Sequence, residues 1–440
     1  MSGAFERRLE EALAGGELLA RLRVFGESFL QRRGDDAAAA RLDGGPLAGL
    51  ARVLATSPLG ARLLAHSPAF LERLLDADAG ALARRGEALG ALAPDPEAGD
   101  LEEFLDALRL FRREETLLAA CLDLGGVAPF PEVSVFLSRL AEAIVERALA
   151  RAQRSGGPSA GALSVLGMGK IGGREFTYHS DLDLIFLYEG APEEVAAVSR
   201  VGQRLISYLT TMTAAGVAYA VDARLRPSGG QGMLVTSFAA FERYQRDQAE
   251  TWEHAALMRA RAIAGEIAAA GSLLERVCAA VSAREGDPWP YLAEMRRRVE
   301  EERGREDGKQ VAFKTGSGGL MDVDFLAAGG WLERGAGARR PELPSNAALL
   351  HAVVKGEGVE RLLRAYRFLR LLEARLRWVA GRSVESLDPA SDGLPIVAEL
   401  LGPGLAPEAL VERVQAERAA IRSAFQSVVR VRTISALGAG

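Results

Sequence analysis

Two aspartates separated by a single residue, Asp181 and Asp183, stand at the start of an apolar run that is typical of a β-strand. Because side chains alternate along a strand, both carboxylates face one side, while Leu182 and Leu184 face the other. Neighbouring carboxylates repel each other unless a cation lies between them, and Mg²⁺ is an oxygen-seeking ion found beside nucleotide phosphates. The pair therefore predicts a magnesium site where a strand begins.

A glycine-rich turn comes before the aspartates, after an apolar run at 162–166 that predicts a buried strand. Glycines allow the backbone to approach a phosphate and turn its N–H groups toward it, and a lysine adds a positive charge. The spacing is neither that of a Walker loop nor that of a dinucleotide fingerprint. The residues of this turn with a predicted nucleotide-binding role are Gly167, Gly169, Lys170, Gly172 and Gly173.

Either motif alone is a weak signal, because an Asp-x-Asp pair is commonly a solvated strand end. The combination is more specific, since Ser180 directly precedes the aspartates and a fixed spacing separates them from the glycines. Together the motifs predict a metal–nucleotide site, in which Ser180 and the turn bind the nucleotide.

Residues 217–227 alternate between polar and apolar side chains, which predicts a further strand with Asp222, Arg224 and Arg226 on one face. Arginine forks suit phosphate oxygens, and a third carboxylate can bridge metal ions or take a proton from an attacking hydroxyl. The alternative is an exposed Asp–Arg ladder that supports an edge strand. In the functional interpretation Asp181, Asp183 and Asp222 are catalytic and bind the metal, and Arg224 and Arg226 bind the nucleotide.

Two later segments carry further charged residues. The run 252–261 is helix-like, and its charges either reach the nucleotide or support the carboxylate strand. The glycine-rich segment 313–319 predicts a mobile loop that closes over a substrate, followed by a helix. The residues with possible supporting roles are Glu253, Arg259, Arg261, Lys314, Asp322 and Asp324.

Composition narrows the class of protein. The 440 residues carry a net charge of −5, so no basic field indicates a nucleic-acid partner. Only two cysteines are present, which argues against a disulfide framework and favours the reducing cytoplasm. Residues 1–22 lack the apolar core of a signal peptide, and no apolar run reaches membrane-spanning length. We therefore expect a cytoplasmic protein with no membrane partner.

The elements that must position these residues are mostly helices, because Ala, Leu and Arg dominate and β-branched residues cluster near 163–235. We predict an α+β fold, mostly α, in which helical regions flank a small mixed sheet. The expected division is a helical region at 1–125, the core at 126–270, and a helical domain with the 313–325 signature at 271–440. Within the last, the Arg- and Leu-rich run 365–379 predicts a core helix with an outward basic edge.

The motifs resemble those of one enzyme family. Gly-x-Gly-Lys-x-Gly-Gly-Arg-Glu at 167–175, followed by Ser-Asp-x-Asp-Leu at 180–184, is similar to a signature of the glutamine synthetase adenylyltransferases, which are polymerase-β-type nucleotidyltransferases. Asp222 with Arg-Leu-Arg-Pro-Ser-Gly at 224–229 resembles the second signature of that family. The stretches 252–261 and 314–325 resemble the third and fourth. The likeness spans most of the chain.

The resemblance implies a polymerase-β-type nucleotidyltransferase core that uses ATP and Mg²⁺. Members of the family usually carry two such units: one attaches AMP from ATP to a tyrosine hydroxyl of glutamine synthetase, and the other removes it by phosphorolysis. This chain holds one unit, and its signatures, among them Trp-Glu-His at 252–254, resemble the adenylylating half more closely. Asp324 departs from the pattern, because the family usually has glutamate there, which leaves its role open.

The expected function is therefore Mg²⁺-dependent AMP transfer to glutamine synthetase, which would regulate nitrogen assimilation, with a nitrogen-signalling regulatory protein as a possible further partner. One alternative is phosphorolytic deadenylylation, in which phosphate is the acceptor and ADP is released. Another is a non-catalytic nucleotide-binding sensor, against which the three acidic positions argue.

Overall fold

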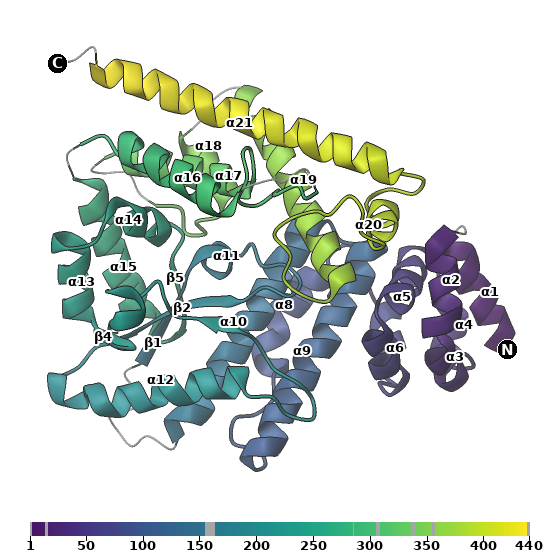
Figure 1. Ribbon diagram of the computed structural model, residues 1–440. Coiled ribbons are helices and arrows are strands. Elements are labelled where there is room, and N and C mark those ends of the chain that lie inside the picture. Colours follow the sequence, from purple (N-terminus) through teal and green to yellow (C-terminus); the bar gives the residue numbers. More distant parts are fainter. Residues whose placement is uncertain are drawn as a thin grey trace.

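The computed structural model describes residues 2–13, 16–154, 163–284, 286–304, 309–335, 340–353 and 357–437. Within these ranges the protein is mostly helical with one small mixed sheet, which confirms the predicted fold class. In Figure 1 the sheet lies among the helices of the middle of the chain. No helix in the described ranges combines the length and the apolarity needed to cross a membrane.

The first part of the chain forms the helices expected before residue 125. The hydroxyl oxygen of Ser57 accepts a hydrogen bond from the N–H of Gly60 at 3.1 Å, and Pro58 occupies the first helical position, so a new helix begins there. Asp100 and Glu103 form a capping box at the start of the long helix α9. The helices of this part are α1 (Ser2–Leu13), α2 (Gly16–Phe25), α3 (Glu27–Arg33), α4 (Ala37–Arg41), α5 (Gly44–Thr56), α6 (Pro58–Ala65), α7 (Phe70–Leu75), α8 (Ala81–Leu92), α9 (Leu101–Leu124) and α10 (Phe130–Arg154).

Five strands form the sheet of the described residues, in the order β3-β2-β1-β5, with β4 also paired to β2. β1 pairs antiparallel with β2 and β5, whereas β3 and β4 run parallel to β2. β1 is the strand expected at 162–166, of which Ala162 lies outside the described residues. The strands are β1 (Leu163–Gly167), β2 (Leu182–Tyr188), β3 (Val221–Asp222), β4 (Val235–Ser237) and β5 (Arg261–Gly265).

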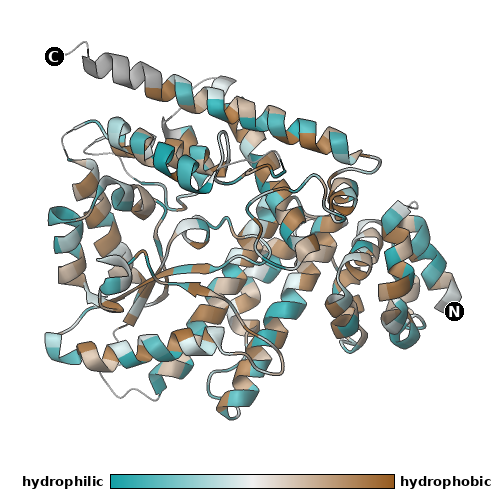
Figure 2. Ribbon diagram, in the orientation of Figure 1, coloured by the Kyte–Doolittle hydropathy of each residue, from teal (hydrophilic) through white to brown (hydrophobic). Residues whose placement is uncertain are grey.

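The two faces of the sheet contribute to two separate cores. Leu182, Leu184 and Phe186 of β2 belong to a core shared with α9, α10 and α12, whereas Ile185 and Leu187 belong to a second core on the opposite face. The predicted alternation of β2 is therefore confirmed. Figure 2 shows apolar strands enclosed by helices that carry hydrophilic residues on their outer sides. The helices around the sheet are α12 (Val195–Thr210), α13 (Phe238–Asp247), α14 (Thr251–Leu257) and α15 (Ile267–Ser282).

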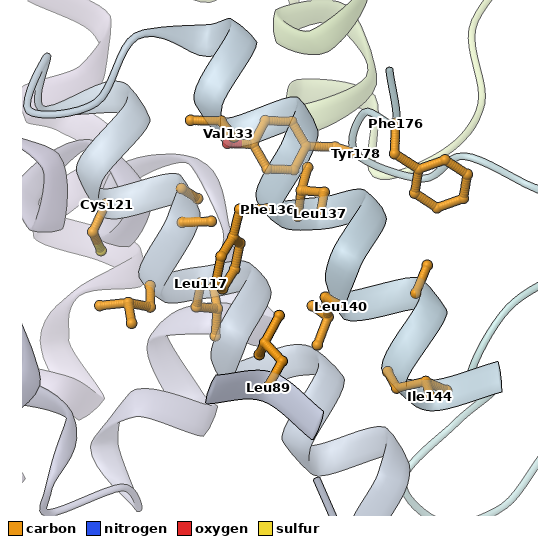
Figure 3. Close-up of a cluster of buried hydrophobic side chains, with 14 of the residues drawn as sticks. Leu89, Leu117, Cys121, Val133, Phe136, Leu137, Leu140, Ile144, Phe176 and Tyr178 are labelled. Atoms are coloured by element: carbon orange, nitrogen blue, oxygen red, sulfur yellow. The ribbon is translucent and has the colours of Figure 1, made fainter. Parts of the chain in front are cut away.

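The first core anchors the segment that joins the glycine turn to β2. Figure 3 shows side chains of α8, α9 and α10 gathered together, with Phe176 and Tyr178 entering from that segment. Both aromatic side chains are buried. Cys121 lies in this core and Cys278 in the second, and both are free thiols.

The C-terminal part is helical, as expected, and one of its helices, α19, contributes to both cores. Leu369 and Leu372 pack in the second core, while Ala374 and Trp378 pack in the first. The indole N–H of Trp378 also donates to the hydroxyl of Thr56 at 2.7 Å. Helix α19 therefore packs in both cores and forms a hydrogen bond with α5 near the start of the chain. The helices of this part are α16 (Trp289–Arg303), α17 (Leu320–Glu333), α18 (Asn346–Val353), α19 (Glu357–Ala380), α20 (Leu394–Leu401) and α21 (Pro407–Leu437).

Two predictions about strands are wrong. Residues 217–227 contain only the two-residue strand β3, after which the chain turns through Pro227 and Ser228, whose φ of 60° is left-handed. The helix-like run 252–261 is interrupted, because α14 ends at Leu257 and Arg261 begins β5. The alanines of β5 hid this strand, since alanine is a strong helix former. Two short 3₁₀ turns complete the fold: η2 (Pro192–Glu194) and η3 (Gly229–Gln231).

Candidate functional site

Two of the three predicted acids face each other across neighbouring strands. Asp183 of β2 lies directly opposite Asp222 of β3 in a parallel pair, so both side chains leave the sheet on the same face. Both are half-buried. Burial raises the pKa of Asp183 to about 6, and the negative charge of Asp222 acts in the same direction. Negative charge on Asp183 is therefore costly, and a cation beside it would lower that cost.

The third acid, Asp181, lies just before β2 and is exposed. Its charge contributes to the raised pKa of Asp183 less than burial and Asp222 do. Among the described residues, no group of three acidic, histidine or cysteine side chains is gathered closely enough to hold a metal ion. The structure therefore joins Asp183 to Asp222 and leaves Asp181 at their edge.

The glycine turn lies directly beside this pair. Its residues Gly169–Gly172 form the one-turn helix α11, and the N–H of Met168 donates to the carbonyl of Asp183 at 2.8 Å. Gly169 has a left-handed φ of 52°, and a Cβ there would lie 2.9 Å from Oδ2 of Asp183. A side chain at this position would be strained and would press on the carboxylate, which explains the glycine.

Gly172 is required by packing instead. A Cβ there would lie 2.0 Å from the carbonyl oxygen of Arg259 and 2.6 Å from that of Gly167, and neither backbone group can rotate away. Gly167 and Gly173 are also closely surrounded, since a Cβ would meet its nearest atoms at 3.0 Å in the first and at 3.2 Å in the second. The tightness of the turn thus comes from its neighbours in the fold, β5 among them.

We expect Gly172→Ala to destabilise the protein by about 1–3 kcal/mol, since a methyl group must force backbone apart. Gly271→Ala is a matched control, because Gly271 lies inside α15 with nothing within 4 Å of its Cβ position. That substitution should stabilise by up to about 1 kcal/mol through helix propensity. Urea unfolding of both variants measures the difference, and equal stabilities would contradict the packing described for the turn.

Lys170 of the turn is paired with a carboxylate far away in sequence, Glu373 of α19. The pKa of Lys170 is lowered to about 7. Burial is the main cause, and the positive charges of Arg370, Arg377 and Lys314 act in the same direction. The negative charge of Glu373 opposes this shift. Arg370 and Arg377 also pair with Glu373, which is completely buried. The predicted outward basic edge of 365–379 is therefore wrong for these arginines: they face inward, because a buried carboxylate attracts them.

Ser180 has a structural role in this state. Its hydroxyl oxygen accepts a hydrogen bond from the N–H of Thr177 at 3.2 Å, and its side chain is buried. The hydroxyl of Tyr178 donates to Asp123, which Arg375 of α19 also binds. The hydrogen bond between Ser180 and Thr177 thus stabilises a turn within the segment before β2. The hydrogen bond of Tyr178 attaches that segment to α9.

The two arginines after β3 differ from each other. Arg224 turns back onto Asp222, with 2.5 Å between the guanidinium and Oδ2, and its side chain is 81% exposed. This hydrogen bond holds the pKa of Asp222 below its usual range. Arg226 donates to the carbonyls of Ala223 and Gly230 at 2.7 and 3.1 Å, so it supports its own loop. The expected shared strand face is absent because β3 ends at Asp222.

The predicted supporting residues fall into distinct networks. Arg259 binds Asp324 at 2.7 Å and also pairs with Glu175, directly after the glycine turn. Arg261 donates to the carbonyl of Gly172 at 3.1 Å. Both arginines therefore support the turn. Glu253 accepts from the hydroxyl of Tyr244 and the N–H of Glu250, so it caps α14.

Residues 314–325, which resemble the fourth signature of the family, contain one charged side chain near the paired acids and one away from them. Lys314 pairs with Glu385, and its positive charge lowers the pKa of Asp183 and of Lys170. Asp322 is buried and binds Nε of Arg296 at 2.5 Å and the N–H of Gly318 at 3.0 Å. Lys314 thus belongs to the electrostatics of the site, whereas Asp322 holds the glycine-rich loop against α16.

Sequence reasoning missed the residues that complete these networks. Glu373 lies 203 residues from Lys170, and Tyr366, which donates to Glu175 at 3.0 Å, lies 191 residues from it. Glu142 of α10 pairs with both Arg174 and Arg261. No local pattern marks a partner at such a separation. The one available signal was a glutamate within an Arg-rich helix, where charge alone suggested an exposed face.

Comparison with known proteins points to one family. The sequence model of glutamate-ammonia ligase adenylyltransferase matches residues 47–276, which is more than half of the chain and includes the glycine turn and both paired acids. The chain belongs to the glutamate-ammonia ligase adenylyltransferase family. A second model, that of the GlnD PII-uridylyltransferase, matches residues 293–429 of this family member.

Individual adenylyltransferase relatives agree. A bifunctional glutamine synthetase adenylyltransferase/adenylyl-removing enzyme of Nitrosococcus oceani is 36% identical over 372 residues, covering 75% of this chain and 38% of the relative. The enzyme of the same description from Chromobacterium violaceum is 36% identical over 358 residues, covering 76% and 39%. The chain spans about two fifths of the length of these curated relatives.

The paired acids of this chain fit a divalent cation of one kind. Mg²⁺ commonly takes only one or two carboxylates from the protein and completes its shell with phosphate oxygens and water. Asp183 and Asp222 supply two carboxylates on one face, and the glycine turn beside them carries no side chain at Gly169 that would cover Asp183. A dedicated cage of three or more protein ligands does not fit the described residues.

Proposed function

We propose that this chain is a Mg²⁺-dependent adenylyltransferase that moves AMP from ATP to a tyrosine hydroxyl of glutamine synthetase. The observation that carries the proposal is the Asp183–Asp222 pair beside the glycine turn, in a chain of this family. The names of the relatives combine addition and removal of AMP. The Arg-Pro-Ser-Gly and Trp-Glu-His stretches support the direction of addition.

In this proposal Asp183 and Asp222 bind the cation, and Asp181 is the third acid of the signature. Bound Mg²⁺ would neutralise the α-phosphate and lower the cost of ionising a tyrosine hydroxyl, whose reference pKa is about 10. The backbone N–H groups of the glycine turn bind phosphate oxygens, and Lys170 and Lys314 add positive charge next to Asp183. The chain thus positions the two reactants and stabilises charge, which dominates phosphoryl-type transfer.

Arg224 has two roles in the proposed cycle. Without nucleotide it binds Asp222 and keeps that carboxylate ionised. Since its side chain is mostly exposed, it is free to leave Asp222 and bind the pyrophosphate end of ATP. Arg226 and Ser180 act by holding their loops, because their polar atoms bond backbone. We place ATP, glutamine synthetase and a nitrogen-signalling regulatory protein together in the cytoplasm.

The test uses the purified chain with ATP labelled at the α-phosphate, Mg²⁺ and unmodified glutamine synthetase. We expect label to appear on glutamine synthetase, and to be lost when its acceptor tyrosine is replaced by phenylalanine. EDTA should abolish labelling, and added Mg²⁺ should restore it. The matched pair of enzyme variants is Asp183→Asn and Asp392→Asn, since Asp392 is exposed and lies outside the site.

Two outcomes would overturn the proposal. If labelled ADP forms only from pre-modified glutamine synthetase and phosphate, the chain removes AMP instead of adding it. If the chain binds ATP but neither adds AMP to glutamine synthetase nor removes it, and Asp183→Asn changes only the affinity for ATP, the chain is a sensor.

A further inference from the structure

A pocket of about 790 Å³ borders the Lys170–Glu373 network, because Arg370 belongs both to that network and to the pocket wall. The wall also contains Gly173, Arg174 and Glu175, which directly follow α11, together with residues of α10, α19 and α21. Six arginines line it, against two glutamates, and we call it the arginine pocket. The arginines are Arg174, Arg361, Arg364, Arg367, Arg370 and Arg413.

Three of these arginines lack a carboxylate partner among the described residues. Arg361, Arg364 and Arg367 are spaced three residues apart on α19, so they lie along one side of the helix, and all three are exposed. By contrast, Arg174 pairs with Glu142, and Arg370 pairs with Glu373. The pocket thus presents a row of three guanidinium groups that form no ion pair with a carboxylate of the described residues.

Much of the remaining wall of the arginine pocket is apolar. Phe130 and Val135 of α10, Leu343, and Phe368 and Leu371 of α19 line it. The guanidinium of Arg413 stacks 4.1 Å from the ring centroid of Phe368, which presents a flat cationic surface next to an aromatic one. A pocket of this volume, mostly apolar with a few convergent charges, is typical of a small-molecule site.

We propose that the arginine pocket binds an organic anion that carries at least two negative charges and an apolar or ring-shaped body. Guanidinium forks bind carboxylates and phosphates in the same bidentate way, so a polycarboxylate and an organic phosphate share the required chemistry. The apolar wall selects against small inorganic anions, which gain nothing from it. This proposal concerns binding and is independent of the reaction catalysed at the paired acids.

The contacts of Arg370 connect the arginine pocket to the glycine turn. One of its guanidinium nitrogens binds Glu373, which holds Lys170, and another donates to the carbonyl of Glu175. An anion that draws Arg370 into the pocket therefore weakens its hold on Glu373 and on Glu175. We infer that the bound anion changes the affinity of the turn for its nucleotide, an inference that rests on the proposed function.

Binding is tested with bis-ANS, a fluorescent disulfonate with an aromatic body, on the full chain. We expect Arg364→Ala/Arg367→Ala to weaken saturable binding at least tenfold relative to wild type. Arg200→Ala is the matched control, because Arg200 is an exposed arginine on α12, outside the pocket. Circular dichroism should show all three proteins equally folded, since the substituted side chains are exposed. Equal bis-ANS affinity in the double variant and the control would overturn the proposal.

Competition then distinguishes the sources of the anion. Benzene-1,3,5-tricarboxylate, ADP without metal, and inorganic phosphate are each titrated against bis-ANS bound to wild type and to the double variant. Displacement by the aromatic tricarboxylate or by ADP from wild type alone supports the proposal and identifies the anion as carboxylate or phosphate. Displacement by inorganic phosphate at the same concentration would overturn the role of the apolar wall. If the double variant instead lost only affinity for glutamine synthetase, the face would be a protein-docking surface, which also overturns it.

The connection to the turn has a separate readout. In the labelling assay, the aromatic tricarboxylate, which cannot replace ATP at the turn as ADP could, should change the KM for ATP at least threefold in wild type and leave it unchanged in Arg364→Ala/Arg367→Ala. A chain without transferase activity would sink the proposed function and leave the bis-ANS result intact. Binding without any change in KM would overturn the inferred connection through Arg370.

Discussion

Asp183→Asn is expected to reduce AMP transfer at least about a thousandfold and, at the same time, to make the folded protein more stable at neutral pH. The loss of activity follows because the substitution removes one of two carboxylates that hold the proposed cation, and such electrostatic stabilisation contributes several kcal/mol to catalysis. Asparagine keeps the size of the side chain, so the strand and its register should be unchanged.

The gain in stability follows from the pKa of the carboxyl group. Burial and the charge of Asp222 raise that pKa from 3.8 to about 6, so the folded protein binds this proton more tightly than the unfolded chain does. Stability therefore falls as pH rises from about 4 to 6, and the ionised form costs roughly 1–3 kcal/mol above that range. The asparagine variant does not incur this cost.

Thermal unfolding without metal at pH 4 and at pH 8 checks the prediction. The stabilisation of Asp183→Asn over wild type should be present at pH 8 and largely absent at pH 4. Asp392→Asn, the exposed control, should match wild type at both values. Added Mg²⁺ should stabilise wild type more than Asp183→Asn. The prediction would be contradicted if Asp183→Asn were less stable than wild type at pH 8. It would also be contradicted if Mg²⁺ stabilised the variant and wild type equally.

Glu373→Gln is expected to be among the most destabilising single substitutions in the chain, by about 3–5 kcal/mol. Glu373 is completely buried and pairs with Lys170, Arg370 and Arg377. Removing the one carboxylate leaves these cations together without compensation, which costs far more than the pair contributes by itself. Since Lys170 belongs to the glycine turn, we also expect weaker nucleotide binding at temperatures where the variant is folded.

The effect should depend on pH in the direction set by this carboxylate. Burial alone would raise the pKa of Glu373, but the attraction of Lys170, Arg370 and Arg377 outweighs it and lowers the pKa to about 2. The stability that this carboxylate contributes is therefore complete above about pH 4.5 and is lost as pH falls toward 2. The difference between wild type and Glu373→Gln should be largest at neutral pH and should shrink in acid.

Denaturant unfolding at pH 7 and at pH 3 measures both parts of this prediction. Glu360→Gln is the control, because Glu360 is an exposed glutamate on the same helix. Unfolding free energies of Glu373→Gln and Glu360→Gln that agree within about 0.5 kcal/mol at pH 7 would contradict the prediction. So would a difference that grows as the solution becomes more acidic.

The sequence was sufficient for features that depend on neighbouring residues. Alternation predicted which side chains of β2 face each core, because this rule acts over a few neighbouring residues. The shared role of Asp183 and Asp222 was expected from two predicted strands and from the resemblance to the family, since no spacing rule relates residues so far apart in the sequence.

The failures have equally physical causes. Arg224 does not lie on the expected strand face, because β3 ends at Asp222 and the chain then turns through Pro227. The exposed guanidinium of Arg224 binds the nearest carboxylate, that of Asp222. Arg261 was assigned to a helix because alanine favours helices, although the residue pairs into the sheet as the start of β5. Glu373 could not be found from sequence, since its partners are brought together by tertiary packing alone.

Helix α19 limits how the molecule can be simplified. It contributes side chains to both cores, and it carries the carboxylate that holds Lys170. An engineer who shortened the gene to the strands and the helices that cover them would therefore remove the counter-ion of Lys170 together with the C-terminal helices. A shortened chain that keeps the glycine turn paired has to extend through residue 380, or receive α19 back as a separate peptide.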